Sequence, residues 1–233
     1  MRQLPRTFLH PTLSLIRSFT RSTHLFCPPL SSMLDRYLIP VIKPALDAAG
    51  LKLSRLGVSA NGLTFTGFFI GMVAAAAVAQ QAYWLGLAAI ALSRVCDGLD
   101  GAVARQTKPT DRGGFLDITL DFVFYASIPM AFALADPARN ALAAAVLLAA
   151  FVGTTSSFLA YAVMAAKRSQ VSTVYPNKSL VFLGGLTEAT ETYALFAAMC
   201  IWPQHFALLA YGFAVACVIT TATRLWWGYT TLD

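Results

Sequence analysis

Charged residues are scarce in this sequence, and acidic residues are the scarcest of them. Only 12% of the 233 residues are charged and 57% are hydrophobic, with 11 Asp and Glu against 17 Lys and Arg. A soluble globular chain carries about twice that share of charge. The composition argues against an ordinary soluble domain and favours a polytopic membrane protein. In such a protein the basic surplus reports on orientation rather than on nucleic-acid binding, and no nucleic-acid partner is expected.

Clustered cysteine and histidine are missing too. The four cysteines are scattered without the spacing of a metal site, and the three histidines are isolated from one another. The sequence therefore predicts no zinc or iron–sulfur centre. Any metal site has to be built from oxygen ligands.

No acidic residue precedes Asp35, although the first 34 residues contain four arginines and many Ser and Thr. This composition is typical of a mitochondrial transit peptide. The preferred alternative is an upstream start codon in a bacterial gene, with Met33 as the true start. Under either interpretation we expect residues 1–32 to be a leader outside the fold, disordered or absent from the native protein.

Residues 33–60 mix apolar residues with Lys, Arg and two aspartates. They predict a juxtamembrane, basic amphipathic helix that lies on the membrane surface. Pro40 and Pro44 predict an interruption of this helix, because proline removes a backbone donor and clashes with the preceding turn. An ordinary solvated linker is the alternative.

Six apolar runs follow, and each is close to the ~20 residues that cross a bilayer. They cover residues 62–79, 82–104, 114–135, 140–166, 179–202 and 205–227. We therefore predict an all-α fold: a membrane bundle of six transmembrane helices over residues 61–229. With a cytoplasmic N-terminus, Arg139 is the only loop base outside, which is a strong positive-inside pattern. Arg94 lies within the second run, one turn before Asp97, with which it is predicted to pair.

Four carboxylates break the apolar pattern in one stretch. Asp97 and Asp100 are spaced i,i+3, and Asp117 and Asp121 are spaced i,i+4, so each pair shares one face of a helix. Acids inside a membrane are costly and usually mark an ion or substrate site. An all-carboxylate site suits the hard cations Mg²⁺ and Mn²⁺. The loop between the pairs allows them to face each other.

The spacing of this stretch resembles a known signature. It reads Asp97-x-x-Asp100-Gly101-x-x-Ala104-Arg105, seven residues, then Gly113-x-x-x-Asp117-x-x-x-Asp121. The pattern is similar to that of the integral membrane (class I) CDP-alcohol phosphatidyltransferases. The resemblance implies transfer of a substituted phosphate from a CDP-alcohol, above all CDP-diacylglycerol, to a small alcohol or alcohol phosphate. It also implies release of CMP, a requirement for two Mg²⁺ or Mn²⁺ ions, and a homodimer.

The same resemblance assigns roles to individual positions. Asp97, Asp100, Asp117 and Asp121 would ligate the ions, and Asp121 would also act as the general base. The donor would contact residues from the start of the first run through the motif, namely Asn61, Thr64, Gly101, Ala104, Arg105, Thr110 and Gly113. Asn61 is equally a candidate helix cap. The loop of seven residues, where eight is common, and Phe122, where many members have Arg, depart from the family.

The acceptor pocket is harder to locate. By the same resemblance, Lys167, Arg168 and Lys178 would bind the phosphate of an acceptor, although plain positive-inside anchoring explains them equally well. Glu188 and Glu191 are spaced i,i+3 within the fifth run. They would bind acceptor hydroxyls, an acceptor ammonium group or a base such as Arg224, unless this turn lies at the wet interface.

Two other functions fit intramembrane acids. A Mg²⁺-dependent membrane prenyltransferase also uses aspartate-rich helices, but six spans are few for it. A divalent-cation transporter is the second alternative, although its site is expected near the bilayer midplane rather than at one face. The topology predicts an active site at the cytoplasmic face of the bacterial inner membrane. The mitochondrial inner membrane replaces it if residues 1–32 are a transit peptide.

Overall fold

The computed structural model describes residues 35–168 and 185–232, and every regular element in these two ranges is helical. The all-α prediction is confirmed for this part of the chain. The predicted leader, residues 1–32, lies outside it. The helices are α2 (Asp35–Arg55), α3 (Ala60–Ala79), α4 (Tyr83–Gln106), α5 (Asp111–Ala135), α6 (Pro137–Lys167), α7 (Ala189–Ile201), the 3₁₀ turn η1 (Pro203–His205) and α8 (Phe206–Thr231).

Five of the six predicted runs coincide with a long helix, and the fifth run does not. Within the described part of residues 179–202, the helix begins only at Ala189 and has 13 residues. At 1.5 Å per residue it is about 20 Å long, shorter than a ~30 Å hydrocarbon core. The prediction of one uniform apolar helix is therefore wrong over residues 185–188. The physical reason is a tight polar turn, which Gly185 and the cap of α7 form there.

Four helices among the described residues are long and apolar enough to cross a membrane: α3, α5, α6 and η1–α8. The 24-residue helix α4 is long enough, but it carries Arg94, Asp97, Asp100 and Arg105. Its charges, rather than its length, keep it out of this group.

Helix α2 runs without a break through Pro40 and Pro44, so the predicted interruption is wrong. The two prolines remove only two of its backbone hydrogen bonds, and α2 is supported by packing on α4. A Cβ added to Gly50 would lie 2.6 Å from Cβ of Ala102, so the two helices touch where Gly50 has no side chain. The position of α2 on the membrane surface stays a prediction.

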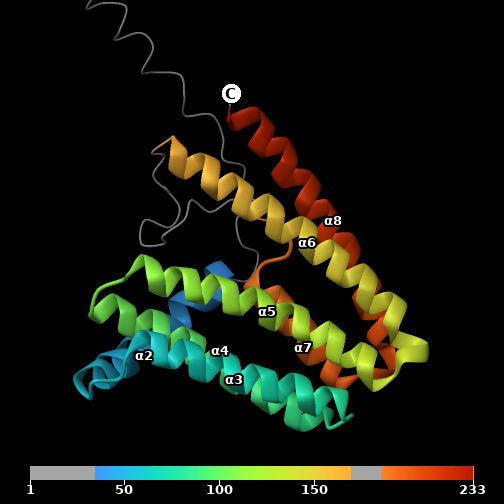
Figure 1. Ribbon diagram of the computed structural model, residues 1–233, viewed down its shortest axis with the longest axis horizontal. Helices are drawn as coiled ribbons and strands as arrows, with labels where there is room; N and C mark the ends of the chain where they lie inside the picture. Colours follow the sequence, from blue (N-terminus) through green and yellow to red (C-terminus); the bar gives the residue numbers. More distant parts are fainter. Residues whose placement is uncertain (1–34, 169–184, 233) are drawn as a thin grey trace, which may run out of the picture.

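The long helices alternate in direction, and this alternation places the polar stretch at one end of the bundle. Figure 1 shows the α4–α5 turn at one end and the α3–α4, α5–α6 and α7–α8 turns at the other. Helix α3 packs on α4 and α5, α4 also contacts α7, and α6 packs on α5 and α8. We call the end with the α4–α5 turn the aspartate end, because Asp97, Asp100, Asp117 and Asp121 lie in the adjoining halves of α4 and α5.

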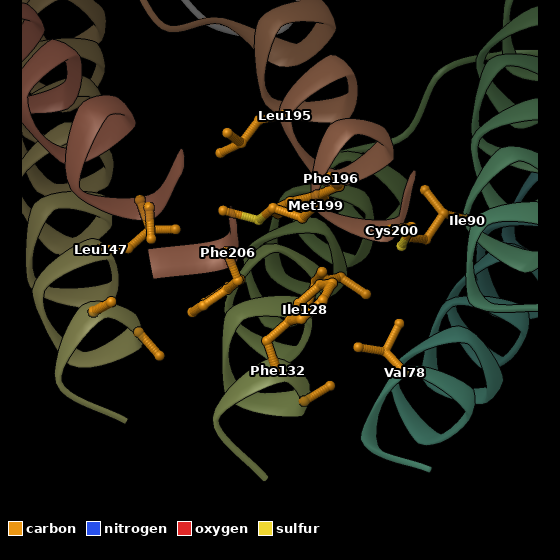
Figure 2. Packing of buried hydrophobic residues seen from close by; sticks show 14 of the residues in the cluster. Val78, Ile90, Ile128, Phe132, Leu147, Leu195, Phe196, Met199, Cys200 and Phe206 are labelled. Atoms are coloured by element: carbon orange, nitrogen blue, oxygen red, sulfur yellow. The ribbon is translucent and has the colours of Figure 1, made fainter. Parts of the chain in front are cut away.

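The apolar core gathers toward the opposite end. Figure 2 shows Ile128 and Phe132 of α5 beside Phe206, with Phe196 and Met199 of α7 above them. The rings of Phe132 and Phe206 stack with centroids 4.7 Å apart. This packing fixes the helices at one end, so side chains at the aspartate end can be polar while the bundle is held together elsewhere.

Candidate metal centre

Three carboxylates from two helices converge between α4 and α5. One oxygen each from Asp97, Asp117 and Asp121 lies within 4.8 Å of the other two, and all three residues are half-buried. The i,i+4 spacing of the α5 pair and the reversal of the chain after Gln106 bring them together. Hard oxygen donors at this separation fit Mg²⁺ or Mn²⁺.

Asp100 lies beside this group and is the most buried of the four aspartates, at 6% exposure. Its Oδ2 accepts a 2.6 Å hydrogen bond from the hydroxyl of Thr64 on α3. All four aspartates line one small pocket between α3, α4 and α5. The lining residues are Thr64, Gly67, Phe68, Arg94, Asp97, Asp100, Asp117, Leu120 and Asp121.

Arg94 is the one basic residue among those that line the pocket. Its Nη1 lies 2.8 Å from Oδ1 of Asp121 and 3.6 Å from Oδ1 of Asp97. The sequence predicted the contact with Asp97, but the shorter contact is with Asp121 on the next helix. Among the lining residues four carboxylates stand beside one guanidinium, and this excess of acidic groups favours the binding of cations.

Thr110 and Gly113 form the start of α5. The hydroxyl of Thr110 caps the helix by accepting the Gly113 N–H at 3.1 Å. A Cβ added to Gly113 would lie 3.1 Å from Oδ1 of Asn61, so glycine lets the α5 start approach α3. Asn61 is not the cap of α3, because Ser59 accepts the Gly62 N–H instead. Asn61 is therefore available at the junction of the two helices.

Gly101, Ala104 and Arg105 follow the first aspartate pair on α4. Gly101 and Ala104 are half-buried, and Arg105 is exposed. The space where Gly101 would carry a Cβ is bordered only by Arg105 Nη1, at 3.3 Å, among the described atoms. Arg105 donates a 2.7 Å hydrogen bond to Oδ1 of Asp47 on α2. The predicted contact of Arg105 with a nucleotide phosphate stays a prediction.

Glu188 and Glu191 lie together at the start of α7. They form a capping box, in which each carboxylate accepts a backbone N–H of the first turn, and Glu188 also accepts the Gly185 N–H at 3.1 Å. Glu188 is buried and interacts electrostatically with Arg224 of α8, one of the partners that the sequence predicted. The i,i+3 spacing is that of a capping box, but Glu188 stands where the usual signature has Ser or Thr, so the sequence did not signal this cap.

The predicted basic residues of the acceptor pocket lie at the end of α6. Lys167 and Arg168 are exposed, and Arg168 donates a hydrogen bond to the Leu232 carbonyl at the end of α8. The structure does not place them in the pocket that the aspartates line. Lys178 lies outside the described residues.

Sequence reasoning did not place two tyrosines beside the site: it took Tyr125 for a packing or interface residue and did not single out Tyr193. The hydroxyl of Tyr193 on α7 accepts from Arg94 Nη1 at 2.9 Å and lies 2.7 Å from the hydroxyl of Tyr125 on α5. The two rings stack with centroids 5.7 Å apart. Neither position belongs to the aspartate motif, and tyrosine in an apolar helix carries no signal of its own. Only the packing of α7 against α4 reveals them.

Fold and pocket together define a helical membrane protein with a carboxylate site at one end of its bundle. Comparison with known proteins gives the class: the sequence model of the CDP-alcohol phosphatidyltransferase family matches residues 57–226, and the chain belongs to this family. The family consists of membrane transferases of phospholipid biosynthesis. This membership confirms the resemblance carried by the aspartate motif.

Individual relatives differ in how much of the chain they match. The inner membrane protein YnjF of Escherichia coli is 51% identical over 200 residues, which are 86% of this chain and 97% of YnjF. An archaetidylinositol phosphate synthase of Methanothermobacter thermautotrophicus is 42% identical over 91 residues, 39% of this chain and 45% of its own length. Similarity to YnjF and the four apolar helices indicate an integral membrane protein.

Solved structures share the fold. The phosphatidylinositol phosphate synthase PgsA1 of Mycobacterium tuberculosis, with CDP-DAG bound, superposes with a TM-score of 0.59 at 20% identity, covering 79% of this chain and 94% of PgsA1. A second structure of PgsA1, in complex with manganese and citrate, gives the same score and identity.

Proposed function

We propose that this protein transfers a phosphatidyl group from CDP-diacylglycerol to a small alcohol or alcohol phosphate and releases CMP. The observation that carries the proposal is the convergence of Asp97, Asp117 and Asp121 within 4.8 Å, with Asp100 in the same pocket. Membership of the family and the CDP-DAG bound in the structural neighbour support the choice of donor. The family match also favours this reaction over the prenyltransferase and transporter alternatives.

The four aspartates would hold two Mg²⁺ or Mn²⁺ ions, and Asp97, Asp117 and Asp121 have the geometry for the first. When bound, such ions neutralise a pyrophosphate and polarise the phosphorus under attack. Asp100 is kept in place by Thr64. Gly101, which leaves open space beside α4, would admit the cytidine, and Arg105 would move from Asp47 to a nucleotide phosphate.

Asp121 would act as the general base. The acceptor hydroxyl oxygen forms a bond to the phosphorus of the lipid-linked phosphate, and its proton passes to the Asp121 carboxylate. The bond from that phosphorus to the oxygen shared with CMP breaks, and CMP leaves with the electron pair. Asp121 suits this role because Arg94 binds only its Oδ1, so its Oδ2 remains for the proton.

The reaction would take place at the cytoplasmic face of a bacterial inner membrane. The aspartate end contains Lys108 in the α4–α5 loop and Arg112 in the first turn of α5, whereas the opposite end carries Arg139. In this topology the chain crosses the bilayer six times, with α7 as the described part of the fifth crossing, and both termini are cytoplasmic. Lys167 and Arg168 at the end of α6 would then face the same side as the aspartates, where an acceptor phosphate enters. The protein would work as a homodimer.

The test is an assay of CMP release by the purified protein in lipid nanodiscs. CDP-diacylglycerol is supplied with Mn²⁺ and one acceptor at a time: inositol phosphate, glycerol 3-phosphate, serine or choline. Inositol phosphate comes first because relatives in two archaea are named archaetidylinositol phosphate synthase. We expect one acceptor to stimulate CMP release, EDTA to abolish it and Asp100→Ala to be inactive. Absence of stimulation by any acceptor, or full activity of Asp100→Ala, would overturn the proposal.

A further inference from the structure

Arg94 is a largely buried cation in the middle of the metal centre. Its side chain is 12% exposed and lies on α4, one turn before Asp97. Its guanidinium also lies 4.2 Å from the centre of the Phe124 ring, so an aromatic face covers it from the side of α5. The family signature begins at Asp97 and does not include this position.

The polar contacts of Arg94 connect α4 to the site and to α7. Nη1 donates to Oδ1 of Asp121 at 2.8 Å and to the Tyr193 hydroxyl at 2.9 Å. Nη2 donates to the Ser93 hydroxyl at 3.0 Å. The Tyr193 hydroxyl in turn meets that of Tyr125, so one chain of contacts joins α4, α5 and α7.

Packing alone does not explain an arginine here. Within the described residues its Nε is buried without a hydrogen-bond partner, so the cost of desolvating the guanidinium is only partly offset. A buried ion pair is often no more stable than apolar residues of similar volume. Methionine or leucine would fill the same space between Phe124 and Tyr193 without that cost. A buried charge that carries this desolvation cost points to a role of Arg94 in the site.

We propose that Arg94 is a positioning residue of the active site, which fixes Asp121 through its Oδ1 and couples it to α7 through Tyr193. This inference rests on the proposed function of the aspartates. Arg94 also supplies one permanent positive charge beside four carboxylates. It thereby weakens the binding of metal ions in the absence of donor, while it keeps Oδ2 of Asp121 aimed at the acceptor. The Arg94 side chain therefore lowers the affinity for metal and at the same time raises the rate of turnover.

This opposition gives a test that a structural role would not mimic. Binding of Mn²⁺ alone is followed by electron paramagnetic resonance on the donor-free protein, and CMP release is measured separately at saturating Mn²⁺. In Arg94→Gln the pocket gains one net negative charge, so we expect Mn²⁺ to bind about tenfold more tightly. Turnover should fall about a hundredfold, because Asp121 is no longer held in the productive geometry.

Two further variants separate charge from position. Arg94→Lys keeps the charge but reaches fewer partners, so we expect Mn²⁺ affinity close to wild type and turnover reduced about tenfold. Tyr193→Phe keeps both charge and ring and removes only the link to α7. It should leave Mn²⁺ affinity unchanged and reduce turnover about tenfold. Arg139→Gln, at the opposite end of the bundle, removes an exposed arginine and should alter neither property.

The inference would be overturned if Mn²⁺ affinity fell together with stability. If Arg94→Gln lowers Mn²⁺ affinity and thermal stability together, Arg94 is structural, and if it changes neither Mn²⁺ affinity nor turnover, Arg94 has no role in the site. Wild-type turnover in Tyr193→Phe would overturn the coupling to α7. A wild type that releases no CMP defeats the proposed function instead, and the Mn²⁺ measurements then still decide whether Arg94 acts as the charge opposing the metal.

Discussion

The hydroxyl of Thr64 donates a 2.6 Å hydrogen bond to Oδ2 of Asp100, and both residues are less than 9% exposed. This contact ties α3 to α4 at the pocket. Thr64 was predicted to touch the donor, and the structure shows that it also orients an aspartate. A buried carboxylate needs such a donor, because leaving it unsatisfied costs the full desolvation penalty.

We therefore predict that Thr64→Val impairs both stability and metal binding. Valine has nearly the same shape but leaves Oδ2 of Asp100 without its hydroxyl partner. The loss of a hydrogen bond to a charged group should lower the free energy of unfolding by about 1.5–3 kcal/mol. The Mn²⁺ concentration for half-maximal CMP release should rise about tenfold, as is usual when a residue orienting a ligand is removed.

Thr64→Ser is the matched control, since it keeps the hydroxyl and loses only a methyl group. It should stay close to wild type in Mn²⁺ requirement. Equal behaviour of the valine and serine variants would show that the hydroxyl does not orient Asp100.

The packing of α3 against α5 leads to a second prediction. A Cβ added to Gly71 would lie 2.6 Å from Cδ2 of the fully buried Phe124, whereas one added to Gly212 would meet no atom within 4 Å. Gly71→Val should therefore destabilise the protein by about 1–3 kcal/mol through overpacking. Gly212→Ala should be neutral or slightly stabilising. Thermal unfolding of the two variants in one detergent is the measurement, and an unchanged midpoint for Gly71→Val would contradict the α3–α5 packing.

Topology gives a third prediction. Reporter fusions near Arg139 and His205 should read as external, and a fusion after the last residue as cytoplasmic, because the other loop bases gather at the aspartate end. The structure places the α5–α6 and α7–α8 turns at one end of the bundle. The fusions near Arg139 and His205 should therefore report the same side of the membrane. An external reading at the C-terminus would put the aspartates on the wrong face for cytidine nucleotides.

Periodicity and motif spacing predicted much of this molecule, because those signals are local. The i,i+3 and i,i+4 aspartate pairs each belong to one helix, so their faces follow from the sequence. The lengths of five apolar runs likewise gave the helices α3–α6 and α8. The fifth run failed, since residues 179–202 are apolar on average although the polar stretch from Thr187 to Glu191 inside them forms the start of a shorter helix.

Contacts between helices could not be predicted from periodicity and motif spacing. Arg94 was assigned to Asp97, its neighbour on the same helix, and the structure places it closer to Asp121, 27 residues away. Tyr193 is 99 residues from Arg94, and no pattern within α7 distinguishes it from a packing tyrosine. Which faces of two helices meet is decided by the fit of side chains such as Gly71 and Phe124, and a helix period does not encode that fit.

The last prediction concerns Asp121, which we separate from the other aspartates. Its Oδ1 accepts from Arg94, and the aspartate is half-buried beside Asp97 and Asp117. Asp121→Asn keeps the shape and one oxygen. Because the guanidinium of Arg94 only donates, the amide oxygen of asparagine should turn toward it and leave the NH₂ group facing the acceptor. That group accepts no proton.

We expect Asp121→Asn to lose turnover by about 10²–10⁴-fold, the usual contribution of a general base. CDP-diacylglycerol should still bind within a fewfold of wild type in the presence of Mn²⁺, since Asp97, Asp100 and Asp117 remain. Donor affinity by calorimetry and CMP release with the best acceptor are measured on the same preparation. Thr64→Ser, which should behave like the wild type, is purified and assayed in parallel as the control variant. If Asp121→Asn transfers at a rate close to wild type, Asp121 is not the base, and the proton must leave by another route such as the phosphate of the acceptor itself.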